Sequence, residues 1–474
     1  MDTTLSPTYE TRGDRTQPTL WMILAAAVLL QLVFVYLALA HGYVLTLFPV
    51  IAAVGLLAFL KPRWGLVGVV ALWFVRYPLS SVVAIYPAEV LLIIISAGFA
   101  AQRLIYGRPV IIWTPVNRWI FLFIGALTIS WLLSTDKAAG FINWGHHLLV
   151  LLFFFVVVGL SERGTIRTCL RVFIGICVIL SLWNVYTFVL AEGHIRAFGP
   201  TGTVFTGLLS LAITYGTARF LLATRITDPW LWGGVILLLL LGQFVTQSRG
   251  AMFQTVTGMA FAGFVAYRWG RHHGQPDIRR RIVMLLTVLS VSGLLLLAIF
   301  TPMIVDVLDR YATRSGNELA SVNMRLFLWK TALRTFLEYP FFGIGLAQED
   351  IWVRLFPAMR YDPLFVSVRG LSVHNDILGY LNSTGLVGSV VLAVLLVKTL
   401  IMGTLLIPGI RRRDDAAWQL GVWCVVFVIV TRTLYEGHLF YSISGITSTT
   451  FFGFLAYLTI PYRSRASERV SGLR

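Results

Sequence analysis

Apolar stretches of roughly 17–25 residues recur along almost the whole chain, and this feature most constrains the fold. A helix of that length crosses about 30 Å of hydrocarbon. Inside lipid, backbone polar groups must bond within their own segment, which favours helices. Only 12% of the 474 residues are charged and 57% are hydrophobic, too little polar surface for a soluble domain of this size. The sequence therefore predicts an all-α polytopic membrane protein.

The net charge of +17 comes mainly from short basic clusters between the apolar runs. This is the positive-inside pattern of cytoplasmic loops, not that of a groove that follows nucleic-acid phosphates. The clusters are the N-terminal tail, Lys61–Arg63, Arg103–Arg108, Arg163–Arg171, Arg219–Arg225, Arg268–Arg281, Arg411–Arg413 and the tail from Arg463. Placing them in the cytoplasm predicts both termini inside and about 14 crossings. Pro78 and Gly207 break two of the apolar segments, so either segment could be re-entrant or interfacial, and the expected range is about 12–14.

Five regions follow from this topology. They are a cytoplasmic tail (1–19), a transmembrane region (20–301) that opens with a retained signal anchor, a large periplasmic loop (302–373), C-terminal transmembrane helices (374–461) and a cytoplasmic tail (462–474). A loop of that length is usually functional. Within it, Asn323–Leu346 has apolar residues at helical spacing with basic residues between them, which predicts an amphipathic helix on the membrane surface. Pro340 and Gly343–Gly345 are expected to end that helix.

A histidine, His374, opens an apolar helix where the chain re-enters the membrane from the long loop. His374, Leu378, Leu381 and Gly385 are expected on one helical face. Glycines beside them would admit a neighbouring helix or a substrate chain. His374 is then a candidate base that accepts a proton from a hydroxyl group. The alternative is a histidine held by structural hydrogen bonds at the membrane interface.

Several arginines are expected at the outer face, although the positive-inside rule disfavours them there. Arg249 lies between Ser248 and Gly250, and a bidentate contact to phosphate would explain it better than simple snorkelling. Arg196 and Arg325 are weaker candidates, because a loop arginine or the charged face of a surface helix would account for each. Together with the histidine they favour a substrate with concentrated negative charge, and a lipid diphosphate fits.

Other chemistries lack support in the sequence. The carboxylates form no convincing metal site, and no P-loop or dinucleotide-binding fingerprint is present, so neither a metal nor another cofactor is expected. Cys169, Cys177 and Cys424 have neither disulfide nor metal-ligand spacing and are expected to be packing residues. The arginines would neutralise a diphosphate leaving group without a metal ion.

Three blocks between Arg196 and Gly388 resemble the O-antigen ligase and polymerase superfamily of bacterial membrane glycosyltransferases. They are Thr246–Gly250, the segment from Arg325 through Trp329 to Gly345, and His374-Asn375 followed after nine residues by Gly385-Leu-Val-Gly388. The resemblance implies a GT-C-like helical fold that transfers a glycan from undecaprenyl diphosphate at the periplasmic face of the inner membrane. It also implies that His374 is the base, that Arg249, Arg196 and Arg325 contact the diphosphate, and that Asn375, Ser248, Gly385 and Gly388 support the site.

Three kinds of glycan acceptor are compatible with this resemblance. A ligase would pass the glycan to lipid A–core, a polymerase would extend a polysaccharide such as O-antigen or exopolysaccharide, and a protein acceptor is a less favoured version. The contrasting class is a flippase or transporter of lipid-linked sugars. Such a protein should carry charged residues inside its spans, whereas the centres of these apolar runs are nearly free of charge. A single displacement would invert the anomeric centre.

Overall fold

A computed structural model describes most of the chain beyond residue 54. The residues described are 55–72, 74, 87–134, 136–160, 163–191, 203–225, 227–313, 315–346, 373, 375–434, 451 and 453–459, without the side chains of 87, 163, 203–204, 295–300 and 302–322. The chain divides into two units, residues 1–57 and residues 58–474, and the principal helices and the candidate site belong to the second.

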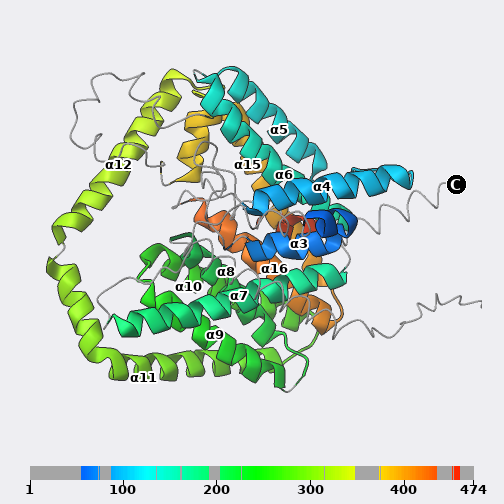
Figure 1. The fold of residues 1–474 in the computed structure, drawn as a ribbon. Helices are drawn as coiled ribbons and strands as arrows, with labels where there is room; N and C mark the ends of the chain where they lie inside the picture. Colours follow the sequence, from blue (N-terminus) through cyan, green and yellow to red (C-terminus); the bar gives the residue numbers. More distant parts are fainter. Residues whose placement is uncertain are drawn as a thin grey trace, which may run out of the picture. The chain divides into compact units, whose positions relative to one another are not determined.

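The described residues are predominantly helical and include no strand, which confirms the predicted all-α class (Figure 1). The principal helices are α3 (Pro62–Leu72), α4 (Pro87–Ile105), α5 (Asn117–Leu132), α6 (Lys137–Leu160), α7 (Arg163–Leu190), α8 (Thr203–Leu221), α9 (Thr227–Val245), α10 (Arg249–His272), α11 (Asp277–Thr313), α12 (Ser315–Glu338), α15 (Asp376–Leu406) and α16 (Arg413–Arg432), with the short 3₁₀ helix η3 (Ile407–Gly409) after α15.

Six of the described segments are long and apolar enough to cross a membrane. They are Ala88–Ile105, Lys137–Leu160, Gly164–Leu190, Thr227–Val245, Asp376–Gly409 and Arg413–Arg432. Two shorter apolar helices, α3 and α5, accompany them. The chain is therefore a multi-pass membrane protein, as its hydropathy predicted, while the total of about 12–14 crossings stays a prediction.

Helix α8 packs against α9, α10 and α16 and is buried along most of its length. Two of its buried hydroxyl groups are satisfied within the helix, since Thr214 donates to the carbonyl of Ser210 at 2.8 Å and Thr217 to that of Ile213 at 2.9 Å. Such bonds let polar residues lie in an apolar bundle without exposed donors. Gly207 does not break this helix, contrary to the expectation from sequence, because the i→i−4 bonds continue through it.

The helices of this bundle share two ends. The N-termini of α8, α10 and α15 and the C-termini of α9 and α16 lie at one, called here the Asn375 end. The opposite ends of these helices, with the N-termini of α7 and α11, make up the Arg413 end. At the latter, Trp269 of α10 donates from its indole nitrogen to the carbonyl of Ile410 at 2.8 Å, and Arg413 reaches the carbonyl of Leu221 in α8.

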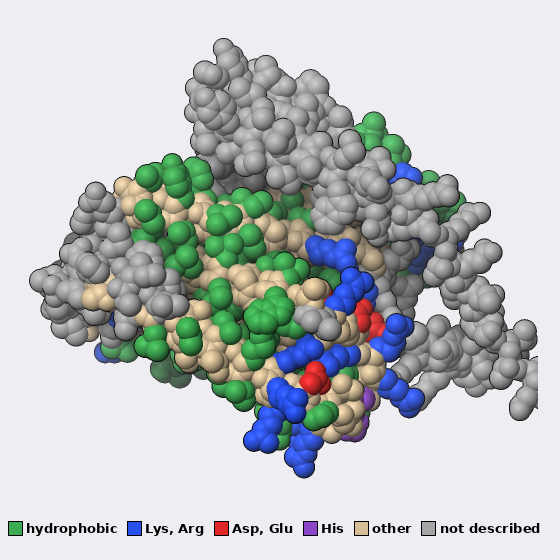
Figure 2. Space-filling view, turned by 90° about the horizontal axis from the view of Figure 1, so that it is seen from below, with side chains coloured by type: hydrophobic (Ala, Val, Ile, Leu, Met, Phe, Trp, Pro, Cys, Tyr) green, Lys and Arg blue, Asp and Glu red, His purple; other side chains and the backbone are tan. Residues whose placement is uncertain are grey.

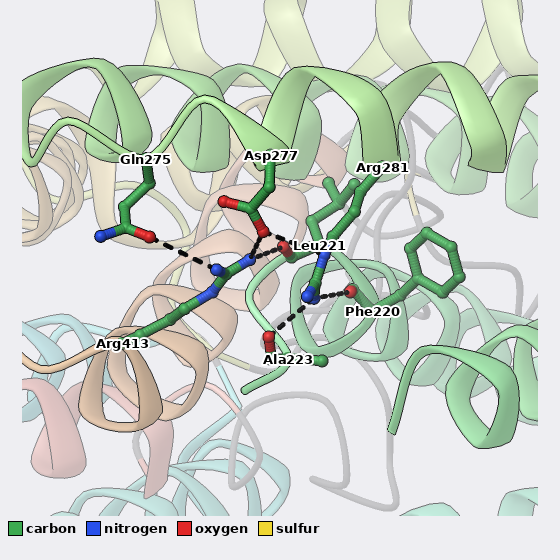
Figure 3. Close-up of polar contacts among 7 residues, drawn as sticks. All are labelled: Phe220, Leu221, Ala223, Gln275, Asp277, Arg281 and Arg413. Carbon is green, nitrogen blue, oxygen red and sulfur yellow. Dashed lines mark hydrogen bonds and ion pairs between the residues drawn. The ribbon is translucent and has the colours of Figure 1, made fainter. Parts of the chain in front are cut away.

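A polar network joins four elements at the Arg413 end (Figure 3). A guanidinium nitrogen of Arg413 lies 2.8 Å from Asp277 and also donates to Leu221, while Arg281 donates to the carbonyl of Ala223 at 2.7 Å. These arginines take up carbonyls that the last turn of α8 leaves without helical partners. Burial alone would raise the pKa of the Asp277 carboxyl, but the hydrogen bond and charge of Arg413, aided by Arg281, hold its pKa below the usual value.

The surface separates charge from apolar area. Figure 2 shows Lys and Arg side chains gathered along one edge of the viewed face, with some Asp and Glu among them, beside a broad area of hydrophobic side chains. Exposed hydrophobic residues of the membrane-spanning region include Leu231, Val256 and Leu286. An apolar surface of this kind is what lipid contact requires.

The predicted amphipathic helix is present as α12, and it ends at Glu338, just before Pro340 as expected. Leu328 and Ala332 are buried on its inner face, whereas Arg325 and Lys330 are exposed. Its position along a membrane surface stays a prediction. Helix α11 runs to Thr313, past the residue 302 at which the long periplasmic loop was expected to begin.

Candidate active site at the Asn375 end

Asn375 caps the N-terminus of α15 and hydrogen-bonds to the segment that follows α16. The Asn375 side-chain oxygen accepts from the backbone N–H of Leu378 at 3.0 Å, a typical N-cap bond. Its side-chain nitrogen donates to the carbonyl of Leu434, directly after α16, at 3.1 Å. The residue before this cap is His374, which lies outside the described residues. The helix starts at Asp376, so His374 precedes the first turn rather than forming part of it.

Val373, on the other side of His374, is also held. It is 2% exposed and packs with Leu328, Ala332 and Ile344. The indole N–H of Trp329 in α12 donates to the Val373 carbonyl at 3.0 Å. Both chain neighbours of His374 therefore take part in hydrogen bonds, Val373 with Trp329 of α12 and Asn375 with Leu434 after α16.

The turn at residues 340–345 is hydrogen-bonded to a break in α15. Gly385 has φ 61° and ψ −159°, so the helix loses its regular geometry there. The freed backbone groups pair with the turn: Leu386 N–H to Pro340 (2.8 Å), Val387 N–H to Phe341 (3.1 Å), Ile344 N–H to Asn382 (2.9 Å) and Gly345 N–H to Ser383 (3.0 Å). Two of the three blocks that carry the family resemblance thus bond directly to each other.

The glycines in this contact serve the fold. A Cβ atom at Gly385 would overlap the backbone of Phe341 and Phe342, and one at Gly343 would overlap the backbone of Ser383. The segment that packs closely against Gly385 is therefore the turn at residues 340–345 of the same protein. The predicted single helical face through His374 and Gly385 is wrong, because α15 starts after the histidine and breaks at the glycine. Gly388 faces the side chain of Thr384 in its own helix.

Arg249 is the first residue of α10 and its side chain is exposed. Ser248 occupies the N-cap position without a side-chain capping bond, and Gln247 has φ 51° in the turn from α9. A guanidinium at a helix N-terminus adds to the positive end of the helix dipole, which suits an anion. Ser210 of α8 donates to the carbonyl of Ala251 at 2.9 Å and so holds this N-terminus against α8.

Arg432 is a further candidate that residue type and spacing did not single out. It is the last residue of α16 and is 4% exposed. Its guanidinium occupies the space beside Gly207, where a Cβ atom would overlap it. Since Leu434 accepts from Asn375, this arginine is close in the chain to the contact beside His374. In the sequence, the position of this arginine at the expected outer end of an apolar stretch was the signal that could have identified it.

The other predicted anion ligands are less closely connected. Arg325 is exposed on α12, one helical turn before Trp329, and no contact among the described residues joins it to Arg249. Arg196 lies outside the described residues. In the described part of this end, the C-terminus of α16 connects Asn375 with Arg432, and α8 connects Arg432 with the start of α10 at Arg249. Within the same part, Arg325 is connected only through Trp329 of its own helix, which bonds to Val373.

Two adjacent histidines, His146 and His147, lie in α6, which begins at Lys137. His147 lies with its Nδ1 2.6 Å from the carbonyl of Asn143 and its Nε2 3.0 Å from the hydroxyl of Tyr380 in α15. The carbonyl can only accept, so Nδ1 carries the proton and the tyrosine donates to Nε2. His146 pairs with Glu89 of α4 at 2.9 Å.

Among the described residues, no group of three potential ligands could hold a metal ion. Cys169, Cys177 and Cys424 are buried and free, as packing residues would be.

A protein-family model described as O-antigen ligase matches residues 234–393. The match runs from within α9 to within α15, so it includes Arg249, Arg325, the 340–345 turn, His374 and Gly385. No curated protein matches the chain. This stretch, about a third of the chain, is therefore similar to the O-antigen ligase family, which confirms the resemblance to the O-antigen ligase and polymerase superfamily.

Proposed function

We propose that this protein transfers a glycan from undecaprenyl diphosphate to an acceptor hydroxyl at the periplasmic face of the bacterial inner membrane. The family match supports a membrane glycosyltransferase or ligase of the O-antigen type. The observation that carries the finer proposal is the fixation of Val373 and Asn375 on either side of His374, at the end of the bundle that also holds Arg249 and Arg432.

In the proposed reaction His374 accepts the proton of the acceptor hydroxyl. The acceptor oxygen attacks the anomeric carbon, its new bond forms as the bond to the diphosphate oxygen breaks, and undecaprenyl diphosphate leaves with the electron pair. One displacement inverts the anomeric centre. A positioned general base contributes typically 10²–10⁴-fold to such a step.

Arginines stabilise the leaving group in this scheme. Four arginines would donate charge-assisted hydrogen bonds to the phosphate oxygens as negative charge develops. They are Arg249 and Arg432, together with Arg196 and Arg325, which the sequence analysis proposed. Asn375, Ser248, Gly385 and Gly388 would act indirectly, by holding the backbone that carries these groups. The proposed chemistry requires no divalent metal and no cofactor.

The orientation rests on charge. Exposed arginines at the Arg413 end include Arg268, Arg271, Arg279, Arg280, Arg411 and Arg412. By the positive-inside rule this end lies in the cytoplasm, and the Asn375 end then faces the periplasm. A GT-C-like arrangement of the helices belongs to the same proposal.

The testing experiment is transfer by purified protein from a lipid-diphosphate glycan donor. Lipid A–core and a second lipid-linked repeat unit are offered as separate acceptors. His374→Ala and Arg249→Ala should lose transfer, while Arg280→Ala, at the other end of the bundle, should retain it. The productive acceptor distinguishes a ligase from a polymerase. Unchanged transfer in folded His374→Ala would contradict the proposed base.

Two further measurements test the chemistry. The anomeric configuration of the product should be opposite to that of the donor, and retention would exclude a single displacement. Activity should survive a chelator such as EDTA. If the wild type transfers glycan to no acceptor but moves labelled lipid-linked sugar across vesicle membranes, the flippase alternative is correct.

A further inference from the structure

A cavity of about 680 Å³ lies at the Arg413 end, between α7, α8, α9 and α16. Charged and aromatic side chains form its wall, so it is not an apolar void between helices. The lining residues are Arg167, Leu170, Arg171, Tyr215, Arg219, Thr224, Arg225, Asp228, Leu231, Trp232, Arg412, Asp414 and Trp418.

Positive charge dominates this cavity. Five arginines line it against two aspartates. Arg167 pairs with Asp414 at 3.4 Å and with Asp415, which is not part of the lining, at 3.2 Å. No carboxylate of the described residues pairs with Arg171, Arg225 or Arg412. The cavity therefore presents net positive charge even when Asp415 is included.

Aromatic rings hold some of these arginines in place. The guanidinium carbon of Arg219 lies 4.4 Å from the ring centre of Trp418 and 5.6 Å from that of Trp232. Arg167 lies 5.0 Å from the Trp418 ring. Stacking of this kind fixes the plane of a guanidinium while its N–H groups stay available to an anion.

Buried polar atoms in the wall still have hydrogen-bonding capacity. The Tyr215 hydroxyl is buried, in a residue only 2% exposed, and has no hydrogen-bond partner among the described residues. The same holds for Nε and Nη1 of Arg219, whose Nη1 lies 3.8 Å from Asp414, an ion-pair distance too long for a hydrogen bond. Buried groups of this type ordinarily have a partner, so these atoms are available to donate to a bound anion.

The positive-inside rule accounts for arginines at this end but not for their convergence. An arginine that serves topology alone extends its charged group into water. Here Arg167 and Arg219 are folded onto Trp418 beside a hollow that is large enough for more than a single phosphate.

We propose that this cavity is a binding site for a phosphate-bearing anion, separate from the site at the Asn375 end. Guanidinium groups bind phosphate oxygens through paired N–H donors, and Tyr215 supplies a further donor. The anion is either the headgroup of an acidic membrane lipid, since basic pockets between helices bind such headgroups, or a soluble phosphate compound. The proposal does not depend on glycan transfer.

The test measures thermal unfolding of the full-length protein in dodecyl maltoside. One arm adds dioctanoyl phosphatidylglycerol, with dioctanoyl phosphatidylcholine as its uncharged counterpart, and the other adds inorganic pyrophosphate. A ligand that binds only the folded protein raises the unfolding temperature in a concentration-dependent manner. The pocket variant is Arg171→Gln/Arg412→Gln, and its charge-matched control is Arg279→Gln/Arg280→Gln, all four positions being exposed.

The expected result is stabilisation of wild type and control by one probe, with roughly tenfold weaker binding for each arginine lost from the pocket. Phosphatidylglycerol acting alone identifies the lipid source, and pyrophosphate acting alone the soluble source. Tyr215→Phe, which removes only the unpartnered hydroxyl, should also weaken binding without lowering the unfolding temperature of the free protein.

Two results would overturn the proposal. One is that neither probe stabilises the wild type. The other is that Arg249→Ala abolishes binding while the pocket variant retains it, which would place the anion at the Asn375 end.

Discussion

The indole nitrogen of Trp329 donates a hydrogen bond of 3.0 Å to the backbone carbonyl of Val373, the residue directly before His374. Trp329 lies in α12, and Asn375, on the other side of the histidine, bonds to Leu434 after α16. The two residues that flank the proposed base are thus hydrogen-bonded to distant parts of the chain.

Trp329→Phe should lower the transfer rate more than it lowers stability. The ring still packs, but the N–H to Val373 is lost, and a single hydrogen bond contributes only about 1 kcal/mol to folding. We expect kcat to fall roughly tenfold or more as His374 loses its alignment. Steady-state kinetics and thermal unfolding should be compared with Trp230→Phe, an exposed tryptophan in α9. Equal kcat in both variants would contradict a positioning role.

Gly385→Ala should destabilise the protein strongly. Residue 385 has a φ of 61° with ψ −159°, a conformation essentially restricted to glycine, and a Cβ atom would overlap the backbone of Phe341. We expect a loss on the order of 3 kcal/mol or more. Gly125→Ala, in an open part of α5, should be neutral or slightly stabilising. Folded yield and unfolding temperature in detergent measure both, and equal unfolding temperatures would refute the close contact with the 340–345 turn.

Gly207→Ala should impair activity while the fold remains intact. The new methyl group takes the space of the Arg432 guanidinium, which is the end of a flexible side chain and can move away. The cost to stability should stay within about 1 kcal/mol, because alanine also favours the helix. If Arg432 contacts the diphosphate, transfer should fall by roughly 10²-fold, the range of a lost charge-stabilising donor. Gly234→Ala in α9 is the control, and full activity of Gly207→Ala would remove Arg432 from the site.

Asp277→Asn should reduce stability at neutral pH but not in acid. The pKa of Asp277 is below its ordinary value of 3.8, since Arg413 and Arg281 outweigh the effect of burial. A depressed pKa adds stability in full above the ordinary value, and the gain is lost as pH falls through the folded-state pKa. The carboxylate is 40% exposed, so the difference should be at most about 1 kcal/mol and smaller in 1 M salt. Thermal unfolding between pH 3 and 7 measures it; a gap between the two proteins that does not change with pH would argue against an ionic contribution.

Hydropathy was sufficient to predict the fold class, because a span is encoded locally: its length and composition decide whether it can lie in lipid. The start of α10 at Arg249 and the end of α12 before Pro340 also follow from local signals in the turn and at the proline. The interruption expected at Gly207 was wrong for a non-local reason. That glycine accommodates Arg432, which lies more than two hundred residues away in the sequence.

The candidate site divides in the same way. His374, Asn375 and Arg249 are identifiable from residue type and spacing, and the last two lie at the same end of the bundle. The role of Arg432, the pairing of His147 with Tyr380, and the bond between Trp329 and Val373 each join different helices. No periodicity within one helix reports which neighbour it will face.

Residues close together in the chain are enough to predict a helical, membrane-embedded protein, the positions of its charges, and the histidine and arginines that are candidates for chemistry. The break of α15 at Gly385 against the 340–345 turn and the convergence of five arginines on one cavity beside Trp418 could not be predicted in this way. Both features require the packing of segments distant in sequence, whose free energy comes from contacts that form only when the helices assemble.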